Sequence, residues 1–513
     1  MTQGSEPVGT CCIVLHTHLP WLAHHGSWPV GEEWLYQAWA SSYLPVFDML
    51  ERLAAEGRRD LLTLGITPIL AAQLDDPYCL REFHTWLGFW QRRAEGVADR
   101  SDPSLRGLGR REFRSARDAN QRFETRWRHG VSPLLRSLSE GGAVELLGGP
   151  ATHPFLPLLD ERVARFCLGV GLDDALLRTG SRPTAIWAPE CGYRPGLEQL
   201  YAAAGVQRFV VDGPTLLAAG RPTNAAWTVG GSDVVAFARD LDVTYRVWSP
   251  RAGYPGGRWY RDFHTFDHPS GLRPARVTSR RTPPESKAPY DPERAMAAVD
   301  TDARDFVDVV RARLDAHRAT PAGGLVVVAY DTELFGHWWH EGPAFLERVL
   351  RLLPEAGVRV TTLRGAVEAG HVAGAVDIGP GSWGSGKDWR VWNGALVSDL
   401  VDDNDLLQKR LLDLVDRHST HRERDAAIDR VAREALLALS SDWAFMVSKD
   451  SAAEYARDRA RGHRAAFERI ARSIERRQTG ASDPRQFWPI DRPFGHVDAR
   501  LLAAAPAKAS AAG

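Results

Sequence analysis

The sequence predicts an α/β protein: a closed or distorted β/α barrel followed by a C-terminal helical domain. Short apolar runs recur along most of the chain with helical stretches between them, as expected of buried parallel strands. Polar and ionisable residues follow several of these runs, which is the layout of a barrel active site. From about residue 400 onward, apolar residues recur at three- and four-residue spacing, which indicates amphipathic helices.

Eight short apolar runs are the candidate strands. They span residues 11–15, 60–66, 143–147, 184–188, 208–212, 233–238, 324–330 and 358–363. The residues at or just after their ends are chemically active types: His16 and His18, His153, Glu190, Asp212, and Asp331 with Glu333. Because the carboxyl ends of parallel barrel strands meet at one rim, these side chains are expected to gather there.

The length of 513 residues exceeds what one hydrophobic core usually supports, so more than one domain is expected. Residues 8–370 are predicted to form the barrel and residues 371–490 the helical domain. Two interruptions are expected within the barrel. One is a helical insertion over about 75–138, and the other is a Gly-, Pro- and Arg-rich loop over about 249–292, a candidate lid. The Ala-rich end, 499–513, is predicted to be a disordered tail.

The composition excludes some classes of function. The 64 basic and 65 acidic residues nearly cancel, which argues against nucleic acid or an anionic membrane as partner. No stretch approaches the ~20 apolar residues of a membrane span, and the polar N-terminus lacks a signal-peptide profile. Five cysteines, an odd number without metal-type spacing, predict reduced thiols in a cytoplasmic protein.

Eighteen tryptophans are unusual, because several lie in loop-like segments beside Gly, Pro, Asp and Arg. A tryptophan inside an apolar periodic run is normally part of the core. Loop tryptophans beside polar groups are typical of a sugar-binding cleft, where a pyranose ring stacks on an apolar face and its hydroxyls form hydrogen bonds. The candidates are Trp21, Trp187, Trp259, Trp338, Trp339, Trp383, Trp389 and Trp392.

Two carboxylates at different strand ends suggest glycoside chemistry. Glu190 lies in a Pro- and Gly-containing turn, where it could instead cap the following helix. Asp331 ends the most hydrophobic strand, where burial raises a carboxyl pKa and suits a general acid; the alternative is a buried Asp satisfied by backbone donors. If the two carboxyl groups lie ~5 Å apart, one attacks the anomeric carbon while the other protonates the leaving oxygen.

Five segments of the chain resemble, in order, motifs of glycoside hydrolase family 57, and within it the 1,4-α-glucan branching enzymes. They are HTHLPW (16–21), GGPATHPFLPLL (148–159), WAPECGYRPGLE (187–198), YDTELFGHWWHEGP (330–343) and the helical stretch SSDWAFMVSKDSAAEYARDRARGHRAAF (440–467). A lone His-x-His is a weak signal, whereas five motifs in the same order are strong. The resemblance covers about residues 8–475. It implies a seven-stranded (β/α)7 barrel, so that one of the eight candidate strands is peripheral or is not a strand.

The resemblance also implies roles for individual residues. Glu190 becomes the nucleophile and Asp331 the general acid/base. His16, His18 and His153 become hydrogen-bond donors around the sugar nearest the scissile bond.

Further residues are implied to shape the substrate cleft. Trp383 and Trp392, in the segment 381–393, match two tryptophans that wall the cleft, and Trp338 lies in the aromatic cluster beside Asp331. Asp442 matches a residue near the acceptor side, contributed by the helical domain. Tyr254 matches the tip of a mobile loop and is expected to be needed for transfer rather than hydrolysis.

The two histidines after the first strand also allow a metal site, as in amidohydrolases and polysaccharide deacetylases. His153 and Asp212 could supply further ligands. That interpretation leaves Glu190 and the tryptophans without a role, so His16 and His18 are expected to be neutral imidazoles that bond sugar hydroxyls, with no metal and no cofactor. Cys191 has no histidine placed in sequence to activate it and is expected to be a packing residue.

The sequence therefore predicts a cytoplasmic branching enzyme acting on amylose or a glycogen-like α-glucan. A retained covalent sugar would pass to a 6-hydroxyl to make an α-1,6 branch. An α-amylase or a 4-α-glucanotransferase on the same scaffold, a glycan-binding protein and a metal-dependent deacetylase remain as alternatives. The oligomeric state is not predicted.

Overall fold

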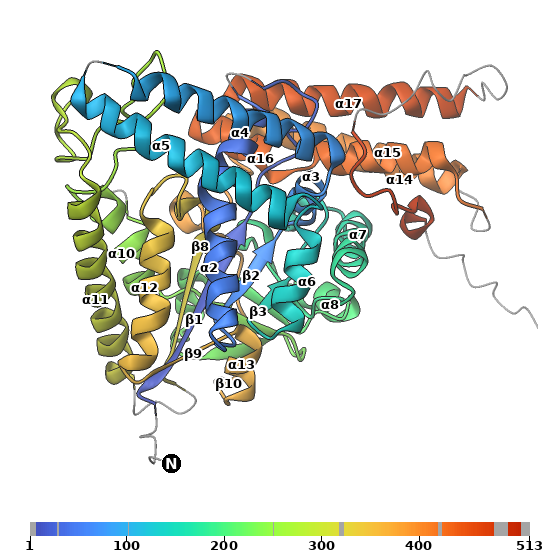
Figure 1. The fold of residues 1–513 in the computed structure, drawn as a ribbon. Coiled ribbons are helices and arrows are strands. Elements are labelled where there is room, and N and C mark those ends of the chain that lie inside the picture. The colour runs from blue at the N-terminus through green and yellow to red at the C-terminus, as the bar shows by residue number, and fades with distance from the viewer. Residues whose placement is uncertain are drawn as a thin grey trace, which may run out of the picture.

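A barrel of parallel strands forms the centre of the computed structural model, which describes residues 7–27, 30–100, 102–249, 251–317, 323–418, 423–476 and 491–503. Within these residues, seven strands follow one another around the barrel in the order β1, β2, β3, β4, β5, β7, β8. Their bounds are β1 (Gly9–Thr17), β2 (Leu62–Ile66), β3 (Val144–Leu147), β4 (Ala185–Ile186), β5 (Arg208–Val211), β7 (Val235–Ala238) and β8 (Leu325–Asp331). The predicted (β/α)7 class is confirmed (Figure 1).

The barrel is distorted because two of its seams are short. Between β3 and β4 the contact is a bridge from Gly148 to Ile186, since β4 has only two residues. Between β7 and β8 the amide of Asp240 donates to the carbonyl of Val327 at 2.8 Å. The loops that follow these short strands carry ionisable side chains at the carboxyl ends of the barrel.

The eighth predicted strand is real but peripheral. β9 (Val358–Thr361) pairs with β1 over Gly9–Cys12, whereas β2 pairs with β1 only from Val14 onward. β9 therefore lies beside the N-terminal end of β1, outside the closed ring. Both ends of β9, Val358 and Thr361, are buried, whereas Arg359 is exposed and Val360 is half-buried, as in a strand that is partly open to solvent.

The sheet extends past the predicted domain boundary at residue 371. β10 (Val372–Val376) pairs with β6 (Ala226–Val229), which runs antiparallel to β7. The boundary was therefore placed too early, because the small residues of β10 give a weak strand signal. The helical domain begins with α14 (Ser398–His418).

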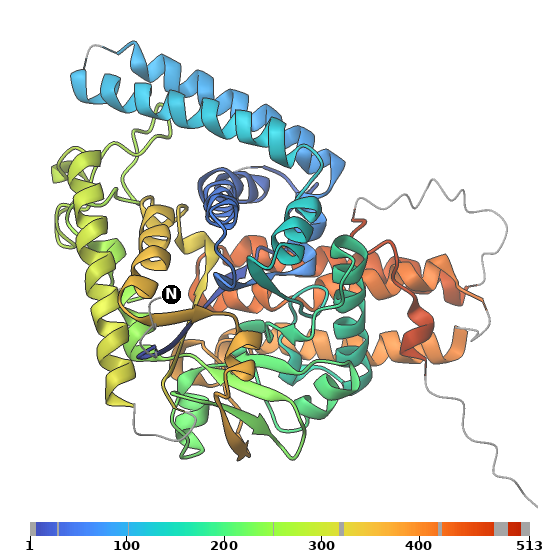
Figure 2. The ribbon, with the colours of Figure 1, turned by 60° about the horizontal axis from the view of Figure 1, so that its bottom comes forward.

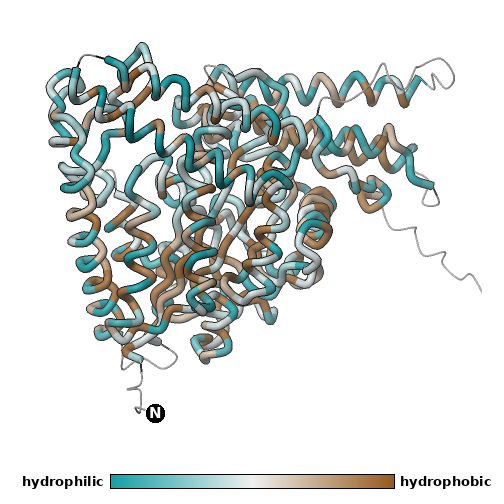
Figure 3. Tube along the Cα trace, viewed as in Figure 1, coloured by the Kyte–Doolittle hydropathy of each residue, from teal (hydrophilic) through white to brown (hydrophobic). Residues whose placement is uncertain are grey.

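Helices surround the barrel and bury their apolar faces against it, as Figure 3 shows by the hydrophobic residues gathered on the strands and inner helix faces. They are α1 (Glu32–Ala38), α2 (Leu44–Ala55), α3 (Pro68–Leu74), α6 (Ser132–Glu140), α7 (Glu161–Thr179), α8 (Leu197–Ala203), α9 (Gly213–Ala218), α10 (Leu241–Val247), α11 (Pro292–Ala316), α12 (Gly342–Glu355) and α13 (Leu363–Glu368). Among the described residues, no helix is both long and apolar enough to cross a bilayer.

The helical insertion is an antiparallel hairpin of α4 (Pro77–Ala98) and α5 (Pro103–Arg122), which forms a separate layer beside the barrel (Figure 2). Each helix begins with the same device: Asp76 and Asp102 accept hydrogen bonds from the first free amides, and proline follows directly. The prediction of 75–138 extended too far, because α6 is a barrel helix that precedes β3.

The loop over 249–292 is folded back on itself and anchored to this hairpin. Antiparallel bridges join Arg261 to Arg276 and Asp267 to Leu272. The Arg261 guanidinium pairs with Glu112 of α5 at 2.7 Å, and Arg100 pairs with Asp267 at 2.9 Å. The loop and the hairpin therefore form one wall rather than two independent segments.

The helical domain comprises α14, α15 (Ala426–Ala438), α16 (Ser441–Lys449) and α17 (Ala453–Glu475). The start of α16 returns to the barrel rim, where the amide of Ser441 donates to the carbonyl of His153 at 3.1 Å. The predicted disordered tail began too early, since Ala499–Leu502 form a 3-10 helix, η11, with both end residues buried. Residues 504–513 lie outside the described residues.

Candidate active site

Glu190 lies just beyond β4, in a turn with unusual backbone geometry. Glu190 and Cys191 have φ values of 62° and 50°, in the left-handed region that non-glycine residues rarely adopt. The carbonyl of Glu190 accepts a hydrogen bond from the amide of Trp383 at 2.8 Å, which holds the turn. Backbone strain of this kind persists where surrounding contacts impose it, and it clusters at functional sites.

The Glu190 carboxylate is buried and doubly hydrogen-bonded. Its Oε2 accepts from the indole N–H of Trp383 at 2.8 Å, and its Oε1 accepts from the hydroxyl of Ser441 at 3.0 Å. Burial raises the pKa of Glu190 to about 7, although both hydrogen bonds act to lower it. The alternative role as a helix cap is wrong, because Gly196 is the N-cap of α8.

Asp331 is the last residue of β8 and the direct neighbour of His16 on β1. Its carboxyl group has no hydrogen bond or ion pair among the described residues, so the alternative of satisfaction by backbone donors is wrong. Burial raises the pKa of Asp331 well above its usual range, and the nearby charges of Glu333 and Glu190 raise it further. A carboxyl group that keeps its proton at neutral pH can act as a general acid.

Glu333 is a further carboxyl group at the site and is buried. Its Oε1 accepts from the Tyr43 hydroxyl at 2.6 Å and from the amide of His18 at 3.2 Å. Burial raises the pKa of Glu333 to about 7. The only sequence signal is its position two residues after Asp331, and its effect is to favour the protonated form of that neighbour.

Three histidines and a tryptophan form a stack at the rim. The His16 ring lies 4.5 Å from Trp187 and 5.0 Å from His153, and the His153 ring lies 3.8 Å from His18. Burial lowers the pKa of both His16 and His153 well below the usual value. A lowered pKa favours the neutral imidazole, which is the state expected of His16.

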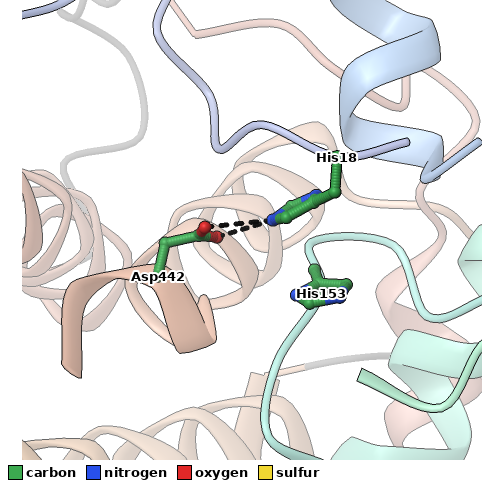
Figure 4. A group of neighbouring side chains, drawn as sticks. All are labelled: His18, His153 and Asp442. Atoms are coloured by element: carbon green, nitrogen blue, oxygen red, sulfur yellow. Dashed lines mark hydrogen bonds and ion pairs between the residues drawn. The ribbon is translucent and has the colours of Figure 1, made fainter. Parts of the chain in front are cut away.

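His18 differs from the expectation. Its Nε2 lies 2.9 Å from Asp442 (Figure 4). Its Nδ1 lies 2.9 Å from the Thr67 hydroxyl, so both ring nitrogens are engaged within the protein. Burial acts to lower the pKa of His18, but the Asp442 carboxylate outweighs it and the pKa is raised. The expected His18, with ring nitrogens available to a sugar, therefore differs from the structure, in which Asp442 of α16 occupies one of them and favours the charged form.

The geometry does not favour a metal at these histidines. Ligand atoms of His18, His153 and Asp442 lie within 4.8 Å of one another. However, the two imidazole rings stack with an interplanar angle of 22°, so their lone pairs run side by side rather than converge on one point. Asp212, the other ligand suggested by sequence, is instead bonded to the Arg239 guanidinium at 2.9 Å and to Lys387 at 2.7 Å.

Asp212 supports the site through a chain of contacts. It is fully buried, and the Arg239 it binds lies 5.2 Å from the Trp383 ring, the same ring that donates to Glu190. Removal of the Asp212 charge leaves two cations without their partner. We therefore treat Asp212 and Arg239 as positioning residues.

Replacement of Asp212 by Asn is expected to lower the free energy of unfolding by about 3–5 kcal/mol, the usual cost of removing one partner of a buried ion pair. The matched control is Glu161→Gln, which removes an exposed helical pair with Arg165 and is expected to cost less than about 1 kcal/mol. Urea denaturation of both variants measures the difference. Equal stabilities would show that the Asp212 pair contributes nothing.

Tryptophans extend the site away from Glu190. Trp248, missed by sequence reasoning because it directly follows the ordinary helical pattern of α10, lies 6.4 Å from Trp383 and 5.9 Å from Trp338. Trp338 is 40% exposed and can present its ring to a ligand. The structure thus joins two predicted cleft tryptophans through a third.

Two predicted binding residues lie elsewhere. Trp392 is buried and stacks on Phe155 at 4.7 Å, so it packs behind the segment that carries Trp383 instead of facing a ligand. The Tyr254 hydroxyl donates to Asp305 of α11, and its ring lies 5.6 Å from Phe345 of α12. Its described contacts anchor the start of the 249–292 loop and do not include the carboxylates.

The Trp383 hydrogen bond gives a pH prediction. A donor to Glu190 stabilises the ionised form, so Trp383→Phe should raise the Glu190 pKa from about 7. The acid limb of the pH profile of kcat/KM should then move by about one unit to higher pH. Trp392→Phe, in the same segment, should leave that limb in place. If the acid limb lies at the same pH in both variants and in the parent, ionisation of Glu190 does not cause it.

Sequence comparisons match both parts of the chain. A profile described as glycosyl hydrolase family 57 matches residues 12–378. A second profile, described as the C-terminal part of 1,4-alpha-glucan branching enzyme, matches residues 405–501. A probable 1,4-alpha-glucan branching enzyme of Mycobacterium tuberculosis is 54% identical over 98% of this chain and 100% of its own length. A 1,4-alpha-glucan branching enzyme of Thermococcus kodakarensis is 32% identical over 91% of this chain and 74% of its own length.

Structural comparisons give the same picture. The branching enzyme of this family from Pyrococcus horikoshii superposes with a TM-score of 0.92 at 30% identity, covering 97% of each chain. The alpha-amylase AmyC of Thermotoga maritima superposes with a TM-score of 0.84 at 25% identity, covering 97% of this chain and 99% of that chain.

Proposed function

The chain belongs to glycosyl hydrolase family 57, and we propose that it is a 1,4-alpha-glucan branching enzyme. The observation that carries this proposal is the contribution of the helical domain to the site. Ser441 of α16 donates to Glu190, and Asp442 pairs with His18. The helical domain, which matches the C-terminal part of branching enzymes, therefore contacts the candidate nucleophile directly.

The reaction is a double displacement at one anomeric carbon. The Glu190 carboxylate attacks that carbon while Asp331 donates its proton to the departing glycosidic oxygen, which leaves a covalent glycosyl ester and a shortened chain. Asp331, now ionised, accepts the proton of an incoming 6-hydroxyl as that oxygen displaces Glu190. The product is an α-1,6 linkage, and both carboxyl groups return to their starting states.

The surroundings fit both steps. Burial raises the pKa of Glu190 to about 7, so this carboxyl group can ionise near neutral pH. Burial and two neighbouring carboxyl groups raise the pKa of Asp331 well above its usual range, which favours its protonated form. The buried rings of His16, His153 and Trp187 stack on one another and form a rigid support beneath the site. We propose that the 249–292 loop, anchored on α5, shields the covalent intermediate from water.

An α-amylase is the second candidate function, because the structural likeness to a protein titled alpha-amylase is also close. Hydrolysis uses the same two carboxyl groups and differs only in the acceptor, which is water. A 4-α-glucanotransferase would use a 4-hydroxyl instead. The linkage of the product therefore decides between the three.

The test is incubation of the purified, chelator-treated protein with amylose and a count of reducing ends before and after a debranching enzyme. Few ends before and many after are expected, because each transfer creates one α-1,6 linkage and no net reducing end. Many ends before, with no gain after, would identify a hydrolase. No new ends at either stage, with altered chain lengths, would identify disproportionation. Loss of activity on chelation would revive a metal site.

We also propose that the substrate is an amylose- or glycogen-like glucan in the cytoplasm. All five cysteines are buried and unpaired, as in a reducing compartment.

A further inference from the structure

A large cavity lies between the α4–α5 hairpin, the 249–292 loop and the segment that follows β8. Its volume is about 530 Å3, within the ~300–1,000 Å3 range of small-molecule sites. Neither Glu190 nor Asp331 is among the described residues that line it. We call it the hairpin cavity.

Aromatic side chains line the hairpin cavity on two sides. On α4, the indole N–H groups of Trp86 and Trp90 are held by carboxylates at 2.8 and 3.0 Å, which fixes the two rings, 5.9 Å apart. On the loop, Phe266 is 40% exposed. Fixed, accessible ring faces suit the apolar face of a pyranose.

The polar groups of the cavity suit a neutral ligand. Four arginines and five carboxylates line it, so no single sign of charge dominates. Many are already paired, as Arg261 is with Glu112 at 2.7 Å. Burial lowers the pKa of His337 to about 3, so its imidazole is neutral. Such a lining offers hydroxyl groups both donors and acceptors without attracting an anion or a cation.

Ring contacts join the cavity to the catalytic cleft. The series starts at Trp383, which donates a hydrogen bond to Glu190. The ring centroids of Trp383 and Trp248 are 6.4 Å apart, and those of Trp248 and Trp338 are 5.9 Å apart. The next two distances are 6.1 Å from Trp338 to His337 and 5.5 Å from His337 to Phe263. The last three of these residues border the cavity or lie within it. A chain bound at Glu190 can therefore continue along aromatic surface into the cavity.

We propose that the hairpin cavity binds a second stretch of an α-1,4-glucan, remote from the scissile bond, and gives the enzyme its preference for long chains. This inference rests on the proposed function, since it assumes an α-glucan substrate. Remote binding of this kind raises kcat/KM for chains long enough to reach the cavity and has no effect on shorter ones.

The test fills the cavity from an exposed position. Ser115 of α5 lines the cavity and is exposed, so Ser115→Trp should block it without disturbing the core. The matched control is Arg117→Trp, an exposed position on the same helix that is not among the lining residues. Ser115→Trp should raise KM for long amylose by about tenfold, the loss of one stacked sugar. Turnover of a short glycosyl fluoride donor should stay unchanged in both variants.

A binding measurement supplies the second readout. In a Glu190→Gln background, calorimetric titration with a long maltooligosaccharide should lose about tenfold in affinity on adding Ser115→Trp or Phe266→Ala, and nothing on adding Arg117→Trp. The inference would be overturned if Ser115→Trp left KM and affinity for the long chains unchanged. It would also be overturned if Ser115→Trp reduced activity equally with the short donor and with amylose. If branches form but Ser115→Trp has no effect, the proposed function stands and the cavity site falls. If hydrolysis replaces branching but Ser115→Trp still weakens long-chain binding, the cavity site stands and the proposed branching function falls.

Discussion

Replacement of Glu190 by Gln is expected to reduce turnover of amylose by roughly 10³-fold or more, because no covalent intermediate can form without the carboxylate. The substitution is nearly isosteric and keeps an oxygen that can accept from Trp383 or Ser441. The pKa of about 7 also means that the parent residue is already protonated in part of the population. The fold should therefore survive, and a thermal melt of the variant should resemble that of the parent.

Chemical rescue separates a lost nucleophile from a distorted site. In Glu190→Ala, azide can occupy the vacated space, attack the anomeric carbon from the same face and yield a glycosyl azide, while Asp331 protonates the departing oxygen. Rescue by azide but not by an equal concentration of chloride is expected. Cys191→Ala is the control, since its buried thiol has a pKa raised well above the usual range by burial and is no nucleophile. Loss of activity in Cys191→Ala, with activity retained in Glu190→Gln, would reverse the assignment.

The two candidate catalytic carboxyl groups could be located from the sequence because strand ends converge. Glu190 and Asp331 each follow an apolar run, and parallel strands of one barrel bring such positions to a single rim whatever their separation in sequence. The same rule placed His16, His18 and His153. The barrel itself followed from the length and spacing of the apolar runs, which depend only on local burial.

Residues whose roles depend on distant partners could not be predicted in this way. Tyr43 and Glu333 form a hydrogen bond across 290 positions, and Ser441 reaches Glu190 across 251. The sequence gives no sign of an acidic partner for His18, yet Asp442 faces it from the helical domain. A pKa reflects the surrounding charges in three dimensions, which local sequence does not contain.

Aromatic residues show the same limit. Trp383 and Trp392 lie in one loop with similar neighbours, but one donates to Glu190 and the other is buried against Phe155. Which ring faces the cleft depends on the backbone of the loop, where Gly384 leaves room for Trp392 to pack: a Cβ there would lie 2.8 Å from the ring. A tryptophan in a loop therefore indicates a cleft, but the direction in which its ring points can be known only from the folded structure.

Replacement of Asp331 by Asn is expected to slow reaction with amylose by roughly 10²–10⁴-fold, the usual contribution of a general acid and base. A sugar oxygen is a poor leaving group unless it is protonated as the bond breaks. Fluoride leaves without such help, so formation of the glycosyl–Glu190 intermediate from an α-glycosyl fluoride should proceed at close to the parent rate. The intermediate should then accumulate, because no base remains to activate the acceptor hydroxyl.

Accumulation of the intermediate distinguishes the loss of a general acid and base from a distortion of the site. Azide needs no deprotonation, so it should discharge the trapped ester of Asp331→Asn and restore turnover of the fluoride donor. The alkaline limb of the parent pH profile, which reports loss of the Asp331 proton, should be absent from the variant. Glu333→Gln removes a neighbouring charge that raises the Asp331 pKa, so it should keep the limb but move it to lower pH. A uniform loss for amylose and fluoride donors would mean that Asp331 acts on the shape of the site and not on the proton.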